Sequence, residues 1–106
     1  MGLFGKKKEE TVVDNTPAAK KMIMENIMDP NKAVGYADNL LKGIPLCLGF
    51  GELEIDEANK IIAFLSGVVY SVGGVAKQLN DNAFLFARKE EFIDGSLNEF
   101  LKNFTK

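Results

Sequence analysis

Apolar positions along residues 20–106 change between two spacings, and this change predicts separate helices and strands. Apolar residues recur three or four positions apart from Ala33 to Leu41 and from Ile55 to about Val69, which predicts two helices with one apolar face each. A last short helix is expected to carry Leu97, Phe100, Leu101 and Phe104. Short apolar runs predict four strands, at residues 21–25, 44–48, 75–79 and 83–87.

Residues that start and stop helices separate these segments. Asp29 can cap a helix that begins at Pro30, because proline is tolerated at the first helical position. Gly43 is expected to end that helix, and the pair Gly73-Gly74 is expected to end the next one. The Asn-Asp-Asn sequence at residues 80–82 lies between two apolar runs and predicts a β-hairpin.

The predicted order of elements is β-α-β-α-β-β-α. Two early strands that are separated by a helix predict a right-handed parallel crossover, and the late pair predicts a hairpin. The expected fold class is therefore α/β, a compact two-layer sandwich in which a mixed β-sheet carries helices on one face. Residues 1–19 hold few apolar residues and are expected to form a flexible tail, which leaves residues 20–106 as one folded domain.

The composition excludes several classes of site. The chain has no histidine, so a Ser-His-Asp triad, a Cys-His pair and a His-ligated metal site cannot form. The one cysteine, Cys47, lies in an apolar run, which favours a reduced, cytoplasmic setting and a role as a small buried hydrophobe. A net charge of −2 counts against nucleic-acid binding. Neither a membrane span nor a signal peptide is expected, because the apolar runs are too short.

Two motifs match a catalytic or nucleotide-binding pattern only in part. Glu52, Glu54, Asp56 and Glu57 crowd the start of a predicted helix, where the helix dipole favours negative charge, so they are expected to have no metal or acid–base role. Gly49-Phe50-Gly51 follows a strand and precedes a helix, as a dinucleotide fingerprint does, but Glu54 stands where the third glycine belongs. These glycines are therefore expected to shape a turn.

The start of the chain combines two large apolar residues, Leu3 and Phe4, with the basic run Lys6, Lys7 and Lys8. Burying each apolar side chain in a lipid surface contributes at most about 1.5–3 kcal/mol, and each lysine near an anionic leaflet adds about 1 kcal/mol. One copy is therefore expected to bind a membrane weakly, and an oligomer more strongly through avidity. A basic start that only keeps the chain soluble explains the same residues.

The segment at residues 56–74, DEANKIIAFLSGVVYSVGG, resembles the SepF family of bacterial cell-division proteins, which carries D-x-A-x-R-I-V-D-F-L-S-G-x-V-Y-A-x-G-G there. Ala37-Asp38-Asn39-Leu40 resembles the family's A-D-x-L helix, and Phe84-Leu85 and Gly95 match later landmarks. The resemblance implies a two-layer α/β fold without catalytic activity or cofactor. It also implies a cytoplasmic protein at the division site that tethers FtsZ, the tubulin-like division protein, to the inner face of the membrane.

The resemblance also implies roles for single residues. Phe84 matches the family's hairpin phenylalanine and is expected to contact the C-terminal tail of FtsZ, with Gln78 and Lys77 beside it. Gln78 stands where the family has a basic residue. The resemblance further implies homodimers that join into polymers, with association surfaces shaped by Gly67, Gly73 and Gly74.

Two other functions remain open from the residues alone. A small-molecule-binding regulatory domain has the same order of elements and would use the Gly49-Phe50-Gly51 turn. A nucleic-acid module is disfavoured by the net charge of −2 and by the lack of a basic-aromatic stripe.

Overall fold

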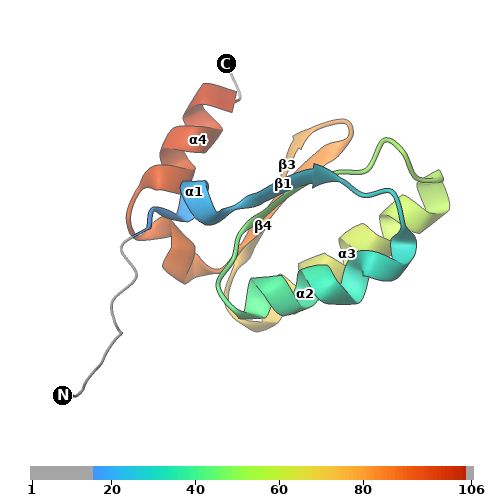
Figure 1. Ribbon diagram of the computed structural model, residues 1–106, viewed down its shortest axis with the longest axis horizontal. Helices are drawn as coiled ribbons and strands as arrows, with labels where there is room; N and C mark the ends of the chain where they lie inside the picture. The colour runs from blue at the N-terminus through green and yellow to red at the C-terminus, as the bar shows by residue number, and fades with distance from the viewer. Residues whose placement is uncertain (1–15, 105–106) are drawn as a thin grey trace.

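The computed structural model describes residues 16–104, which form a four-stranded sheet with helices on both of its faces (Figure 1). The strands lie in the order β1-β2-β4-β3. The predicted α/β class and the mixed sheet are confirmed, and the order β-α-β-α-β-β-α is found with one additional short helix before the first strand. Of the predicted tail at residues 1–19, residues 1–15 lie outside the described residues, whereas residues 18 and 19 belong to a short helix.

The parallel half of the sheet consists of β1 (Ile23–Asn26) and β2 (Leu46–Gly49). The connection between them contains the 3₁₀ helix η1 (Pro30–Lys32) and α2 (Ala33–Leu41). Asp29 caps η1 as predicted, because its side chain accepts a hydrogen bond of 2.9 Å from the Asn31 amide. The crossover therefore begins where the sequence placed it.

The antiparallel half is the hairpin of β3 (Val75–Asn80) and β4 (Ala83–Ala87), and β4 also pairs with β2. Phe84 and Phe86 alternate with Leu85 along β4, so the two aromatic rings lie on one face of the sheet. The hairpin thus places Phe84 near the turn and Phe86 deeper in the protein.

One face of the sheet packs against α2 and α3 (Ile55–Ser71). This side holds the main core, whose fully buried side chains include Leu40, Leu46, Leu48, Leu65 and Phe86. The apolar stripe that predicted α3 is the stripe that packs, because Ala58, Ile61, Leu65 and Val69 are all buried. The helices predicted to lie on one face are confirmed for α2 and α3.

The opposite face carries a smaller cluster. Leu97 of α4 (Ser96–Phe104) packs there with Ala87 of β4 and with Ala18 of a four-residue helix, α1 (Ala18–Lys21), that the apolar pattern did not predict. Between β4 and α4 the chain forms a second 3₁₀ helix, η2 (Lys89–Phe92). The last predicted helix therefore exists, but it lies on the face away from α2 and α3.

Asp94 joins the two ends of the described chain. Its Oδ2 atom accepts a hydrogen bond of 2.9 Å from the Ala18 amide, and its Oδ1 atom accepts one of 2.8 Å from the Ser96 amide. Ser96 Oγ in turn accepts a 3.0 Å bond from the Ala19 amide. The bonds from the Ser96 and Ala18 amides hold the pKa of the Asp94 carboxyl below its ordinary value. One carboxylate thereby ties α1 to the start of α4.

Gly73 and Gly74 end α3. Gly73 has a positive φ of 75°, its amide donates to the Tyr70 carbonyl at 3.0 Å, and the Gly74 amide donates to the Val69 carbonyl at 2.7 Å. A Cβ atom on Gly74 would lie 2.5 Å from Val69 Cγ2 and would also overlap the Ala87 carbonyl oxygen. The pair is therefore required for the close approach of α3 and the sheet.

Candidate functional site

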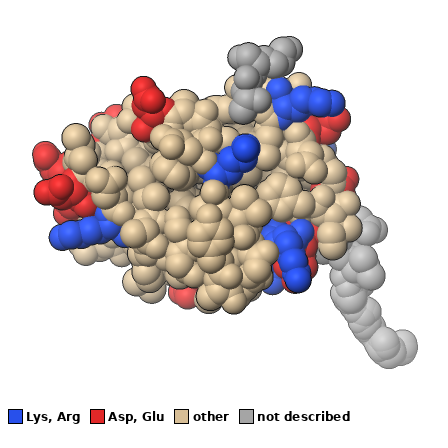
Figure 2. All heavy atoms as spheres, turned by 180° about the vertical axis from the view of Figure 1, so that it is seen from behind, with Lys and Arg blue, Asp and Glu red and all other residues tan. Residues whose placement is uncertain are grey.

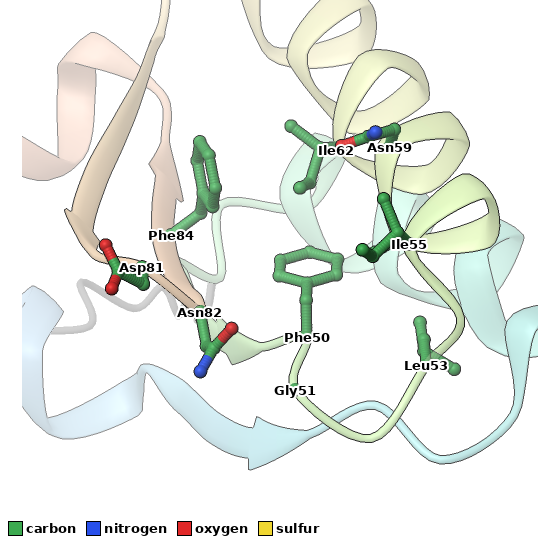
Figure 3. A pocket seen from close by; sticks show the side chains of 10 residues that line it. Phe50, Gly51, Leu53, Ile55, Asn59, Ile62, Asp81, Asn82 and Phe84 are labelled. Carbon is green, nitrogen blue, oxygen red and sulfur yellow. The ribbon is translucent and has the colours of Figure 1, made fainter.

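A cavity of about 320 Å³ lies between the first turns of α3, the loop after β2 and the turn of the β3–β4 hairpin (Figure 3). Its apolar wall contains Phe50, Leu53, Ile55, Ile62 and Phe84. Its polar rim contains Asn59, Asp81 and Asn82. We call this cavity the hairpin pocket.

Aromatic rings form one side of the hairpin pocket. The Phe84 ring meets Phe50 edge-on, with 5.9 Å between the ring centroids, and stacks on Phe86 at 6.0 Å. Phe86 is fully buried, whereas Phe84 is only partly buried. The buried ring holds the exposed one in place, so Phe84 presents a fixed apolar surface to the cavity.

Backbone contacts hold the two walls together. The Phe50 amide donates a 2.6 Å hydrogen bond to the Asn82 carbonyl, which links the loop after β2 to the hairpin turn. The Asn82 amide donates to Asn80 Oδ1 at 2.8 Å. Asp81 is the one ionisable side chain that lines the hairpin pocket, so its rim carries negative charge.

The three residues expected to contact a partner do not all lie on the same face of the sheet. Gln78 lies directly opposite Phe84 in the hairpin register, and its side-chain amide donates to the Asn80 carbonyl at 3.1 Å. Lys77 pairs with Leu85 instead, so its side chain lies on the other face of the sheet. Neither Gln78 nor Lys77 lines the hairpin pocket. Phe84 and Gln78 are brought together, and Lys77 is not.

Several residues of the hairpin pocket had no predicted role there. Ile55 and Ile62 were counted with the apolar stripe of α3, but Ile55 is 77% exposed. Ile55, Asn59 and Ile62 are spaced four and three residues apart and therefore share one side of the helix. This spacing, together with an apolar residue at the exposed start of a helix, was the signal available in the sequence.

Gly67, the third residue predicted to shape an association surface, lies on the exposed side of α3. A Cβ atom there would meet no atom within 4 Å. Ala63 and Ser71 lie one turn to either side, and the partly exposed rings of Phe64 and Tyr70 flank this line. Figure 2 views the molecule from behind Figure 1, and most charged side chains on that side lie toward the edges, with one basic side chain near the middle.

The described residues were compared with the patterns of a metal site and of a membrane span. Within residues 16–104, no three His, Cys, Asp or Glu side chains are grouped so that they could hold a metal ion. Burial raises the pKa of the Cys47 thiol. No helix in the described part of the chain is both long and apolar enough to cross a membrane. The predicted membrane-contact residues lie outside the described residues: Leu3, Phe4, Lys6, Lys7 and Lys8.

A second cavity, of about 300 Å³, lies beside α2 and β1 and is lined by polar side chains. Tyr36 there is buried and donates its hydroxyl hydrogen bond to Glu25. Burial, reinforced by this bond and by the nearby negative charge of Glu25, raises the pKa of Tyr36 to about 12. The phenol therefore stays protonated at neutral pH and acts as a structural link between α2 and the edge strand.

Comparison with known proteins supports one family. A family model described as Cell division protein SepF matches residues 10–90. A protein named Cell division protein SepF from Carboxydothermus hydrogenoformans is 27% identical over 92% of this chain and 82% of its own length. Its namesake from Alkaliphilus oremlandii is 26% identical over 95% of this chain and 69% of its own length. The namesake from Listeria monocytogenes serotype 4a is 34% identical over 66% of this chain and 46% of its own length.

Proposed function

The chain belongs to the SepF family of cell division proteins, and from this premise we propose that it is a non-enzymatic adaptor that binds the C-terminal tail of FtsZ in the hairpin pocket. The observation that carries the proposal is the position of Phe84. The aromatic residue that matches the family's landmark is also the one that a buried ring holds at the wall of the hairpin pocket.

The hairpin pocket has the chemistry of a peptide-docking site. Six apolar side chains, including that of Ala58, converge on one cavity, and amide side chains at its rim can bond to a peptide backbone. Ile55 is already well exposed before any partner binds. Covering such side chains contributes about 1.5–3 kcal/mol for each one fully buried, before the cost of ordering the peptide.

The charges around the pocket define the partner segment further. Asp81 lines the cavity, and Glu52, Glu54, Asp56 and Glu57 lie in the loop and first helical turn beside it. Lys77, on the opposite face, is too badly placed to pair with an acidic peptide in the pocket. The adaptor is therefore proposed to select a segment that combines apolar residues with basic ones.

Self-association is proposed to use the exposed side of α3. Small residues at positions 63, 67 and 71 would let a second helix approach closely, and Phe64 and Tyr70 would supply apolar area at the margins. Gly73 and Gly74 act from behind this surface by ending α3 against the sheet. Several copies joined in this way would strengthen a weak membrane contact by residues 1–10 through avidity.

The test is fluorescence anisotropy of a labelled FtsZ C-terminal tail peptide titrated with the protein. Saturable binding is expected. Phe84→Ala should weaken it, and circular dichroism should verify that the variant is folded, because Phe84 also packs on Phe50 and Phe86.

A second variant separates binding from folding. Ile55→Ser changes a 77% exposed residue of the pocket and should weaken binding about tenfold, since it removes about 1.4 kcal/mol of apolar contact. Ile93→Ser is the matched control, because Ile93 is 83% exposed and does not line the pocket. Equal affinities for both isoleucine variants and for the unchanged protein would refute the pocket as the binding site.

A further inference from the structure

The face of the sheet away from α2 and α3 carries an open groove of about 250 Å³. It lies between the end of α4 and the strands, and its apolar side chains are those of Met24, Cys47, Ala83 and Phe104. Met24 is 57% exposed and Phe104 is 40% exposed, so large apolar groups face each other across the groove with little cover. We call it the α4 groove.

The structure fixes where the N-terminal segment leaves the folded part. The hydrogen bonds from the Ala18 and Ala19 amides to Asp94 and Ser96 hold α1 at the first turn of α4. Phe104 lies eight residues farther along that helix, which corresponds to about 12 Å at 1.5 Å per residue. The described part of the chain therefore begins near the first turn of α4, and the α4 groove lies at the other end of that helix.

We propose that the apolar start of the chain, Leu3-Phe4, docks in the α4 groove of the same molecule. About twelve residues connect Phe4 to Thr16, and they can span about 40 Å when extended, far more than the distance along α4. A tether of this length also gives an effective concentration in the millimolar range, so a weak contact suffices.

The side chains of the Leu3-Phe4 pair and of the α4 groove are chemically complementary. The Phe4 ring can lie against the ring of Phe104 and the sulfur of Met24, both of which are favourable partners for an aromatic group. Glu25 also lines the groove, but its carboxylate accepts the Tyr36 hydroxyl hydrogen bond on the α2 side of the sheet, so the match between the two surfaces rests on apolar contact. The valines at positions 12 and 13 are smaller, and their tether to Thr16 reaches only about 10–13 Å.

Docking and membrane contact would use the same two side chains and would exclude each other. A membrane or a partner that captures Leu3 and Phe4 would therefore uncover the α4 groove. This consequence rests on the proposed membrane contact, but the docking itself does not, and it is independent of FtsZ binding.

Cys47, the one cysteine of the chain, lines the α4 groove, so its rate of alkylation shows whether the groove is covered. The test compares the rate of Cys47 alkylation by iodoacetamide in the full chain and in the double variant Leu3→Ser/Phe4→Ser. If the docked form is about three-quarters populated, the double variant should react about fourfold faster. Glu9→Ser/Glu10→Ser is the matched control, with two serines in the same segment and no loss of apolar surface, and its rate should stay unchanged.

Two results would overturn the proposal. One is an equal alkylation rate in both double variants and the unchanged protein. The other is a rate of Cys47 alkylation that falls as protein concentration rises and is the same in Leu3→Ser/Phe4→Ser as in the unchanged protein. That result would mean that a second copy of the chain covers the groove. The ¹³C methyl signal of Met24 gives an independent readout, since it should move in the Leu3→Ser/Phe4→Ser variant and not in the control. Adding anionic vesicles to the unchanged protein then tests whether a membrane releases the docked segment.

Discussion

The two faces of the sheet differ in how completely they are covered. The face under α2 and α3 contributes to a cluster of twelve buried residues, whereas the face under α1 and α4 contributes to a cluster of three. Fully buried apolar area is the main source of stability, so the first face carries most of the folding free energy. The second face is left with an open groove and exposed apolar side chains.

This difference separates folding from recognition. The hairpin pocket lies at the rim of the well-packed face, where Phe86 in the core supports Phe84 at the surface. The α4 groove lies on the sparsely packed face, where α4 is anchored at its first turn by Leu97 and by Asp94. The rigid hairpin pocket and the open α4 groove thus lie on opposite faces of the same four-stranded sheet.

Deleting one buried side chain from each face should give the largest contrast. Phe86→Ala should lower the free energy of unfolding by about 3–5 kcal/mol, because the ring is enclosed between the sheet and both helices. Leu97→Ala should cost about 2 kcal/mol, since the small cluster around it can relax into the space. Urea denaturation followed by circular dichroism measures both. Equal losses would show that the two faces carry similar shares of the stability.

Replacing either of two glycines in or after α3 by alanine should change the free energy of unfolding in opposite directions. Gly74→Ala should destabilise the protein by about 1–3 kcal/mol, because the new Cβ would overlap the Ala87 carbonyl and Val69. Gly67→Ala should stabilise the monomer by about 0.5–1 kcal/mol, since alanine is the better helix former and the site is open. Thermal unfolding at low concentration checks both signs, and a destabilising Gly67→Ala would mean that this face is not free in the monomer.

Filling the exposed line of α3 with a larger side chain tests the association surface itself. Gly67→Gln should leave the fold intact and shift sedimentation toward the monomer, because the longer side chain prevents close helix approach. Lys42→Gln, at the exposed end of α2, serves as the control with the same new side chain. An unchanged distribution of species for Gly67→Gln would move the association surface elsewhere.

The smallest expected effect is the loss of stability at low pH when the Asp94 carboxylate becomes protonated. The pKa of Asp94 is lower in the folded protein than in the unfolded chain, so its contribution to stability is complete above the unfolded value of about 3.9. That contribution is lost as the pH falls through the lower folded value. The unfolding free energies of the unchanged protein and of Asp94→Asn should therefore converge below about pH 4. A gap that stays constant down to pH 2 would contradict the role of the carboxylate in joining α1 to α4.

The sequence predicted the elements whose apolar residues repeat with a clear period. The apolar spacing from Ile55 to about Val69 predicted α3, and the short apolar run at residues 83–87 predicted β4. Helix α1 was not predicted, because four residues, Ala-Ala-Lys-Lys, are too few to show a period and their order depends on Asp94, which lies 76 positions away.

The site was predictable only in part for a similar reason. Phe84, which the family resemblance singled out, lines the hairpin pocket, but the wall it faces comes from residues 50–62, and only folding brings these segments together. The placement of Lys77 beside Gln78 ignored the alternation of side chains along a strand, which sends neighbours to opposite faces. The steric role of Gly74 depends on the approach of Ala87 and Val69, which the sequence pattern does not contain.

The central claim is that the hairpin pocket, on the well-packed side of the sheet, binds the FtsZ tail. Titrating the ¹⁵N-labelled protein with the unlabelled tail peptide and following its amide signals tests this claim most directly. The account predicts saturable shifts centred on Gly51, Asn59, Asn82 and Phe84, with the signals of Met24, Cys47 and Leu97 unmoved. Shifts centred on the α4 groove, or no shifts for a folded protein, would contradict it.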